Sequence, residues 1–374
     1  MKNILRTAAI AAIAALALTA CGAAPTTTPT AGSTTGGTAA TGEATPSATP
    51  LNFKACIVSD AGGFDDKSFN QLSFEGVQQA TKDLGAQFKS AQSNAATDYA
   101  PNLQAMASEN CNLIFAVGFN LTADTVTSAQ ANPNIHYALI DAQPSDASGN
   151  PINIPNIKPI LYDTAQAAFL AGYLAAGYSK VGKVGTFGGQ PYPTVTIFMD
   201  GFLQGVNYYN QVKGKSVKVV GWDGKNGQFT GGFDANDTAK GVAQQVIDQG
   251  VDVLLPVGGP IYQSAIAAVK DSGKDIALIG VDADQYNTDP NIQPYILTSI
   301  MKKMDVSAAD TTKAAAKGDF DPSAYVGTLA NGGVDIAPFH NFESKVDPTL
   351  ASEVKQLKQD IIDGKVKVKS YLAK

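Results

Sequence analysis

Short apolar runs alternate with longer segments of helical period along most of the chain. The first run, residues 53–59, reads FKACIVS, and apolar positions at helical spacing follow it from about residue 67 to near Gly85. Short apolar runs that are bounded by turns are typical of buried strands, and strands that alternate with helices indicate a parallel sheet. The pattern therefore predicts an α/β protein.

The alternation continues in two series, followed by a shorter C-terminal part. The first series adds strands at 86–91, 113–117 and 135–141, with helices at 99–109 and 122–129. The second begins with a strand at 157–162 and continues with strands at 183–187, 216–221, 251–257 and 276–280, with helices at 164–178, 194–210, 236–249 and 261–271. A strand from Ile296, a helix at 302–317, a hairpin and a helix at 348–362 complete the chain. Two series, each too short for a large domain, predict twin lobes.

The amino terminus follows a different pattern. Lys2 and Arg6 precede an apolar run at about residues 8–17, and LTAC follows at 18–21. This order of charged, apolar and small residues is typical of an export signal, and the run is too short for a permanent membrane-spanning helix. LTAC resembles the bacterial lipobox, so we expect a lipoprotein signal peptide at 1–20 and lipidation of Cys21. A plain signal peptide with an incidental cysteine is the alternative.

Composition separates a tether from the globular part. Residues 21–50 are almost entirely Ala, Thr, Gly, Pro and Ser, with Glu43 as the only charge, which predicts a disordered tether. Loss of the leader changes the formal charge from −6 to −8, because Lys2 and Arg6 leave with it. So acidic a chain is not expected to bind nucleic acid. No later apolar segment approaches the ~20 residues of a membrane span, so we expect membrane attachment through the lipid alone.

Candidate chemistry lies where apolar strands end. Asp60, Asp141 and Asp282 each follow such a strand, and open α/β folds bind ligands at the carboxyl edge of the sheet. A single carboxylate there is often a helix cap, but three at equivalent positions indicate a shared site. The stretch at 59–70, SDAGGFDDKSFN, adds a flexible turn and the ring of Phe69, a combination that suits a sugar joined to a planar base. An ordinary strand-to-helix turn, capped by Asp66 or Ser68 with Phe69 in the core, is the alternative.

Several motifs, taken in order, resemble the basic membrane protein family. These are the substrate-binding lipoproteins of ABC importers that include the purine nucleoside receptors. The resemblance covers nearly everything after residue 53. It rests on DAGGFDDKSFN at 60–70, LIFAVGF at 113–119, ALID at 138–141, FDANDTAKG at 233–241, VDVLLPVGG at 251–259, GVDADQ at 280–285 and ILTSIMKKMD at 296–305.

The resemblance implies a fold and a biological setting. The fold is that of a type I periplasmic binding protein, with two doubly wound Rossmann-like lobes and a ligand cleft between them. The N-terminal lobe is expected at 51–161 plus about 298–330, and the C-terminal lobe at 162–297 plus about 331–374. The protein is expected to be a monomer on the extracytoplasmic face of the cell membrane. There it would deliver a purine nucleoside to the permease and ATPase subunits of an ABC transporter, without a cofactor.

The resemblance also implies roles for particular residues. Asp60, Asp141 and Asp282 would hold the nucleoside, with Asp282 on the ribose hydroxyls. Phe69 and Phe233 would sandwich the base. An additional aromatic-rich loop leaves Trp222 and Phe229 as alternatives for the second ring.

Further residues are expected at the same site. Asn70 is a candidate for the polar edge of the base, and Lys302 for the ribose, with Lys303 as the alternative. Gly258 and Gly259 would expose backbone groups to the ligand, although a simple strand-to-helix turn explains them equally well.

Two cysteines remain after lipidation of Cys21. An even pair in an exported protein is typical of a disulfide, so Cys56 and Cys111 are expected to be joined, with two buried thiols as the alternative. No Cys-His cluster indicates zinc, so no metal is expected.

The expected class is a non-catalytic receptor rather than an enzyme. The chain has only two histidines and no G-x-S-x-G motif, which argues against nucleophilic catalysis. Two alternatives stay open: a receptor for a sugar or autoinducer on the same fold, and a nucleoside hydrolase that uses the aspartates.

Overall fold

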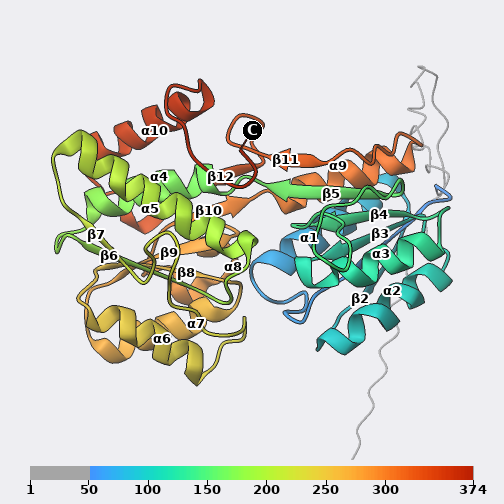
Figure 1. Ribbon diagram of the computed structural model, residues 1–374, viewed down its shortest axis with the longest axis horizontal. Coiled ribbons are helices and arrows are strands. Elements are labelled where there is room, and N and C mark those ends of the chain that lie inside the picture. The colour runs from blue at the N-terminus through green and yellow to red at the C-terminus, as the bar shows by residue number, and fades with distance from the viewer. Residues whose placement is uncertain (1–50, 374) are drawn as a thin grey trace, which may run out of the picture. The chain divides into compact units, whose positions relative to one another are not determined.

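The computed structural model describes residues 51–373. The signal peptide predicted at 1–20, the lipidated Cys21 and the tether predicted at 21–50 lie outside these residues. Within them the chain forms two six-stranded sheets, with helices on both faces of each (Figure 1). Both sheets belong to the same unit of the chain.

The first sheet is parallel throughout, in the order β11-β5-β4-β3-β1-β2. Its central strand β3 is buried at every position, because helices cover both faces of a parallel sheet. The strands are β1 (Lys54–Val58), β2 (Gln87–Ala91), β3 (Leu113–Val117), β4 (His136–Ile140), β5 (Ile157–Tyr162) and β11 (Tyr325–Gly327).

Alternate residues of these strands face two helix layers. Ile114 packs with α2 (Tyr99–Ser108) and α3 (Thr122–Ala131) on one face, whereas Phe115 packs toward α1 (Phe69–Leu84) and α9 (Met304–Ala316) on the other. The helices α1 and α9 approach so closely that a Cβ atom at Gly76 would lie 2.2 Å from the carbonyl oxygen of Asp305. A glycine is therefore required at this crossing.

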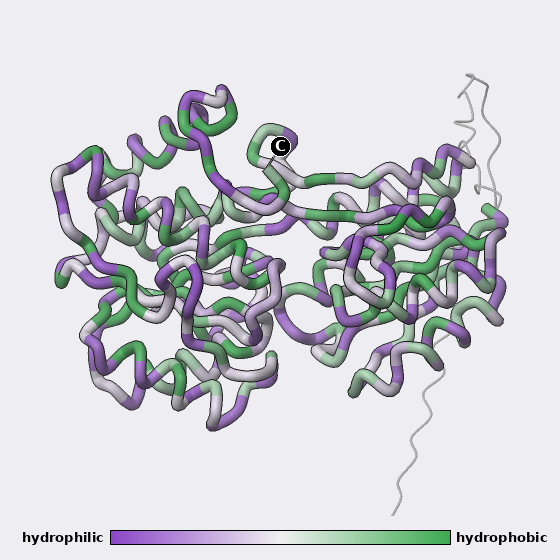
Figure 2. Tube along the Cα trace, in the orientation of Figure 1, coloured by the Kyte–Doolittle hydropathy of each residue, from purple (hydrophilic) through white to green (hydrophobic). Residues whose placement is uncertain are grey.

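The second sheet repeats this arrangement in the order β12-β10-β9-β8-β6-β7, with only β12 antiparallel. Its strands are β6 (Lys183–Gly188), β7 (Lys218–Val220), β8 (Val253–Val257), β9 (Ala277–Asp282), β10 (Ile296–Lys302) and β12 (Val334–Ile336). Figure 2 shows how apolar residues concentrate in the strands of both sheets.

The helices of the second sheet also form two layers. One face carries α6 (Asp237–Asp248) and α7 (Ile261–Ser272). The other carries α4 (Ala165–Tyr178) and α5 (Pro193–Lys213), with α10 (Pro348–Ile362) packed against α4. The short helix α8 (Gln285–Thr288) follows β9. The predicted α/β class with two doubly wound lobes is confirmed. The strand at 157–162, predicted to begin the second series, instead pairs with β4 in the first sheet as β5.

The chain passes between the lobes at three places: from β5 to α4, from β10 to α9, and from β11 to β12. The predicted hairpin near the end is wrong, because β11 pairs with β5 in the first sheet and β12 with β10 in the second. Two short strands separated by a glycine-rich turn have the local pattern of a hairpin, and only the tertiary pairing distinguishes the two cases. The lobe boundary predicted at about residue 298 falls inside β10, which pairs in the second sheet as far as Lys302.

In the part of the chain from residue 51 to 373, no helix is both long enough and apolar enough to cross a bilayer.

Candidate functional site

A cavity of about 220 Å³ lies between loops that follow strands of both sheets. This is somewhat below the range of about 300–1,000 Å³ typical of sites for drug-sized ligands, so the cavity suits a small molecule. The structure brings every residue predicted for ligand binding to its wall: Asp60, Phe69, Asn70, Asp141, Phe233, Gly258, Gly259, Asp282 and Lys302.

Asp141 and Asp282 occupy corresponding places in the two lobes. Asp141 directly follows β4 and Asp282 ends β9, and each of these strands is third in the order of its sheet. Both residues have a left-handed backbone, with φ of 62° and 68°. Aspartate tolerates this region better than most residues, and such conformations persist where the surrounding structure holds them in place. Both carboxylates are thereby turned toward the cavity.

Lys302 lies between these two carboxylates. Its Nζ is 2.6 Å from Asp141 Oδ2 and 3.4 Å from Asp282 Oδ1, and the three side chains are almost completely buried. The ammonium also lies 5.3 Å from the ring centre of Phe69 and 4.9 Å from that of Phe198. Lys302 is the last residue of β10, so the sequence-based placement at a helix start is wrong: α9 begins at Met304.

Burial and the attraction between opposite charges act against each other in this group. Burial lowers the pKa of Lys302, but the carboxylates of Asp141 and Asp282 more than compensate, so its pKa is raised. Burial raises the pKa of Asp141 to about 6, although the Lys302 ammonium opposes the shift. The neighbouring Lys303 lies outside the cavity lining, with its Nζ 4.0 Å from Met301 Sδ. Of the two lysines, Lys302 is therefore the one that lines the cavity.

Asp60 forms a second polar region, at the end of the first strand. Its Oδ1 accepts hydrogen bonds from the backbone N–H of Gly62 (3.0 Å) and from Nδ2 of Asn70 (2.7 Å). Burial raises its pKa, and these hydrogen bonds oppose the shift. A Cβ atom at Gly118 would lie 2.9 Å from Asp60 Oδ2, so a glycine is needed at the end of β3 for this carboxylate to fit.

Aromatic rings form much of the apolar wall. Phe69 begins α1, and Phe233 belongs to the loop before α6. The ring of Phe119 lies 6.2 Å from that of Phe233 and 4.4 Å from that of Tyr192, so it joins the lobes beside the cavity.

The alternative rings of the 222–233 loop have other contacts. Trp222 donates a hydrogen bond from Nε1 to Asp200 Oδ1 (2.9 Å) and packs edge-on against Phe229. Neither ring lines the cavity. A Cβ atom at Gly258 would lie 2.8 Å from the Phe233 ring, so this glycine makes room for the ring.

Sequence reasoning missed several cavity residues. Phe119 lies inside a recognised motif but was assigned no role in ligand binding, and Asp66 was named as a possible helix cap but was not among the predicted ligand-binding residues. Phe198 gave no signal, because it lies on the apolar side of α5, where a phenylalanine normally packs in the core. The full set also includes Ala61, Gly62, Asn120, Thr194, Val195, Asp234, Val257 and Pro260.

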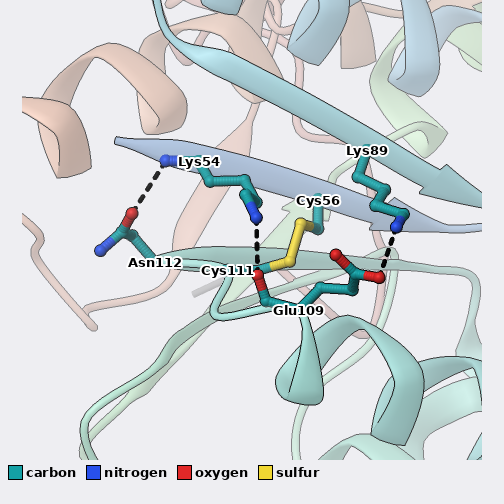
Figure 3. The surroundings of a disulfide bond; sticks show 6 residues. All are labelled: Lys54, Cys56, Lys89, Glu109, Cys111 and Asn112. Atoms are coloured by element: carbon teal, nitrogen blue, oxygen red, sulfur yellow. Dashed lines mark hydrogen bonds and ion pairs between the residues drawn. A yellow bond between two sulfur atoms is a disulfide. The ribbon is translucent and has the colours of Figure 1, made fainter. Parts of the chain in front are cut away.

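The structure contains a disulfide between Cys56 in β1 and Cys111 just before β3, with Cα atoms 6.0 Å apart (Figure 3). Around it, the backbone N–H of Lys54 donates a hydrogen bond to Asn112 Oδ1, and Lys54 Nζ donates one to the carbonyl oxygen of Glu109. Within residues 51–373, no group of His, Cys, Asp and Glu side chains is arranged to hold a metal ion.

Comparison with known proteins gives consistent matches. The family described as "ABC transporter substrate-binding protein PnrA-like" matches residues 53–370. The chain is 30% identical to the ABC transporter nucleoside-binding protein BmpA of Lactococcus lactis subsp. cremoris, over 85% of this chain and 90% of that protein. It is 31% identical to an uncharacterized lipoprotein of Pyrococcus abyssi, over 71% of this chain and 64% of that protein.

A solved structure extends the similarity to the fold. The ABC transporter system solute-binding protein of Aeropyrum pernix K1 has a TM-score of 0.75 and 26% identity, covering 86% of this chain and 94% of that chain. The predicted type I periplasmic binding protein fold is thus confirmed. As its sequence motifs indicated, the chain belongs to the PnrA-like family of ABC transporter substrate-binding proteins.

Proposed function

We propose that this substrate-binding protein takes up a purine nucleoside between its lobes and delivers it to an ABC permease. One observation carries the proposal: a buried Asp–Lys–Asp group, Asp141, Lys302 and Asp282, lies in the same small cavity as the rings of Phe69 and Phe233. Polar groups that recognise hydroxyls and rings that stack on a base are the two features that a nucleoside requires.

The ribose belongs at the Asp–Lys–Asp group. Asp282 Oδ1 is buried and accepts no hydrogen bond beyond its ion-pair contact with Lys302 Nζ at 3.4 Å, and a buried carboxylate oxygen in this state favours a ligand donor. A ribose hydroxyl donates such a bond, and Lys302 can donate to a neighbouring hydroxyl oxygen. Charge-assisted hydrogen bonds of this kind contribute about 1.5–3 kcal/mol each.

The base belongs between Phe69 and Phe233, with its polar edge toward Asp60. Stacking on an aromatic side chain contributes about 1–3 kcal/mol per base. The Oδ2 atom of Asp60 is the acceptor for an N–H of the base, because Oδ1 already accepts bonds from Gly62 and Asn70. A carboxylate at this position favours bases that donate a hydrogen bond to it.

The proposed setting rests on the predicted leader and on the family. The proposed anchor is a lipid on Cys21, which would hold a monomer on the outer face of the cell membrane beside the permease and ATPase subunits. Ligand binding would favour the closed arrangement of the lobes, which the permease recognises. The protein would leave the nucleoside chemically unchanged.

The experiment is titration of the purified full chain with inosine in a calorimeter, with galactose as the comparison ligand and chromatography of the inosine afterwards. Micromolar or tighter binding of intact inosine supports the proposal. Binding of galactose alone would replace the nucleoside by a sugar, and release of hypoxanthine and ribose would make the protein a hydrolase. Incorporation of labelled palmitate by the wild type, but not by Cys21→Ser, tests the anchor separately.

A further inference from the structure

Asp66 lines the cavity but has no capacity left for a ligand. Its side chain is buried, and its two carboxylate oxygens accept four hydrogen bonds. Oδ1 accepts from the backbone N–H groups of Ser68 (3.0 Å) and Gln71 (3.1 Å). Oδ2 accepts from the backbone N–H (2.8 Å) and from Nδ2 (3.2 Å) of Asn70. Four bonds are about the full capacity of a carboxylate, so Asp66 must act through its neighbours.

The first connection leads through Asn70 to Asp60. The Nδ2 group of Asn70 donates to Asp66 Oδ2 and to Asp60 Oδ1, and its Oδ1 accepts from the backbone N–H of Asp60 (3.3 Å). Both amide hydrogens are therefore in use, and the orientation of the amide is fixed. Asn70 was predicted to contact the base. In this arrangement its amide instead holds Asp60, so that Oδ2 of Asp60 remains available to the ligand.

The second connection leads through Ser68 to the other lobe. Asp66 holds the backbone N–H of Ser68, and Ser68 Oγ lies within hydrogen-bond distance of the carbonyl oxygen of Val281 (3.1 Å) and of Asp282 Oδ2 (3.2 Å). The single hydroxyl hydrogen of Ser68 is shared between these two acceptors, and the contact on Oδ2 of Asp282 leaves Oδ1 beside Lys302. The segment that Asp66 orders therefore also sets the direction of the ribose-binding carboxylate.

From these two connections we infer that Asp66 is a positioning residue that aligns both ligand carboxylates, Asp60 through Asn70 and Asp282 through Ser68. The inference rests on the proposed nucleoside function, and deepens it: one residue outside direct ligand contact sets selectivity at both ends of the ligand. When Asp66 aligns them, the Asp60 carboxylate requires an N–H donor on the base, and the Asp282 carboxylate requires the ribose hydroxyls. A cap with only a structural role would affect every ligand equally.

Two pairs of ligands separate the two ends. Inosine carries N1–H, whereas ring nitrogen 1 of purine riboside is an acceptor that faces Asp60 unfavourably. Inosine carries both ribose hydroxyls, whereas 2′,3′-dideoxyinosine lacks them. Each loss removes a hydrogen bond to a charged group, so the wild type should prefer inosine over each partner by roughly 10- to 100-fold.

The test compares these two affinity ratios in three variants by calorimetry. Asn70→Ala should reduce only the preference for inosine over purine riboside, and Ser68→Ala only the preference over dideoxyinosine. Asp66→Asn should reduce both to within about threefold, because its amide presents a donor to groups that already donate. Asp347→Asn is the matched control, since Asp347 also accepts a backbone hydrogen bond at a helix start, from Thr349 in α10 (2.7 Å). It should leave both ratios at the wild-type values.

Other results would contradict the inference or the proposed function. If Asp66→Asn weakens all three ligands by the same factor, or if the wild type lacks either preference, the inference is overturned while nucleoside binding stands. If the wild type binds no nucleoside, the proposed function fails and the inference fails with it. Thermal unfolding of Asp66→Asn without ligand establishes that the variant is folded at the titration temperature.

Discussion

Lys302 Nζ lies 2.6 Å from Asp141 Oδ2, and this ion pair joins the two lobes, because Lys302 ends β10 of the second sheet and Asp141 follows β4 of the first. The same ammonium lies 3.4 Å from Oδ1 of Asp282, the residue that ends the corresponding strand of the second sheet. The polar centre of the site is thus complete only when both lobes contribute. A ligand that contacts this group favours the arrangement in which the lobes meet.

Replacing Lys302 by methionine should destabilise the protein and abolish ligand binding. The change leaves two carboxylates buried without their cation, and removing one partner of a buried ion pair typically costs about 3–5 kcal/mol. Urea unfolding measures the stability, and inosine titration measures the binding. Lys303→Met is the control, because Lys303 lies outside the cavity lining; a loss of equal size in this variant would contradict the role of Lys302.

Phe233 is predicted to provide the stacking ring of the 222–233 loop. Phe233→Ala should weaken inosine binding by roughly 5- to 150-fold, the equivalent of about 1–3 kcal/mol of stacking. Trp222→Phe removes the hydrogen bond to Asp200 while keeping an aromatic ring, and should leave the affinity within about threefold of the wild type. Calorimetric titration compares the two variants, and an unchanged affinity in Phe233→Ala would show that Phe233 is not the stacking ring.

Removing the disulfide should affect stability more than recognition. Cys56 and Cys111 are buried and close a loop with a sequence separation of 55 residues. Loss of a disulfide typically costs about 2–5 kcal/mol, through the greater freedom of the unfolded chain. The double variant Cys56→Ala/Cys111→Ala should therefore unfold at lower urea concentration. Neither cysteine lines the cavity, so inosine affinity should be retained wherever the variant is folded. An affinity loss greater than tenfold in the folded protein would show that the disulfide also shapes the site.

The ionisation of Asp66 should make the free energy of unfolding depend on pH. Burial raises the pKa of its carboxyl to about 6, outweighing the hydrogen bonds that lower it, whereas an unfolded chain has a value near 3.9. Well below pH 4 the group is protonated in both states. Between about pH 4 and 6 the unfolded chain releases its proton more readily, so the free energy of unfolding falls as pH rises.

The measurement is urea unfolding without ligand at several pH values from 4 to 7. Relative to Asp66→Asn, the wild type should lose about 2 kcal/mol across this range. Asp347 provides the opposite case, because hydrogen bonds from Thr349 lower its pKa. Its contribution increases stability as pH rises, so Asp347→Asn should leave the decline due to Asp66 in place. Parallel curves for the wild type and Asp66→Asn would refute the raised pKa.

The order of apolar runs and turns was sufficient to predict most of the fold. Parallel strands are buried on both faces, so strands such as β3 and β8 are continuous apolar runs, and a helical period follows each. The strand ends that carry Asp60, Asp141 and Asp282 were recognisable for the same reason. The family motifs then indicated which side chains meet.

The sequence alone did not predict structural features that depend on residues far away along the chain. The segments at 325–327 and 334–336 have the pattern of a hairpin, yet each pairs with a strand far away in the chain, in a different sheet. Lys302 stands at an apparent helix start, but two carboxylates from other strands hold it buried at the end of β10.

The sequence by itself determined the α/β class, the strand ends and the family, because these follow from periodicity and from motifs within short stretches. The tertiary structure decided which side chains share the cavity, that Phe233 rather than Trp222 enters it, and that Asn70 is occupied with Asp60 and Asp66. These outcomes depend on distances between residues remote in sequence and on how many hydrogen bonds each polar atom already makes. Neither quantity is encoded in a local pattern.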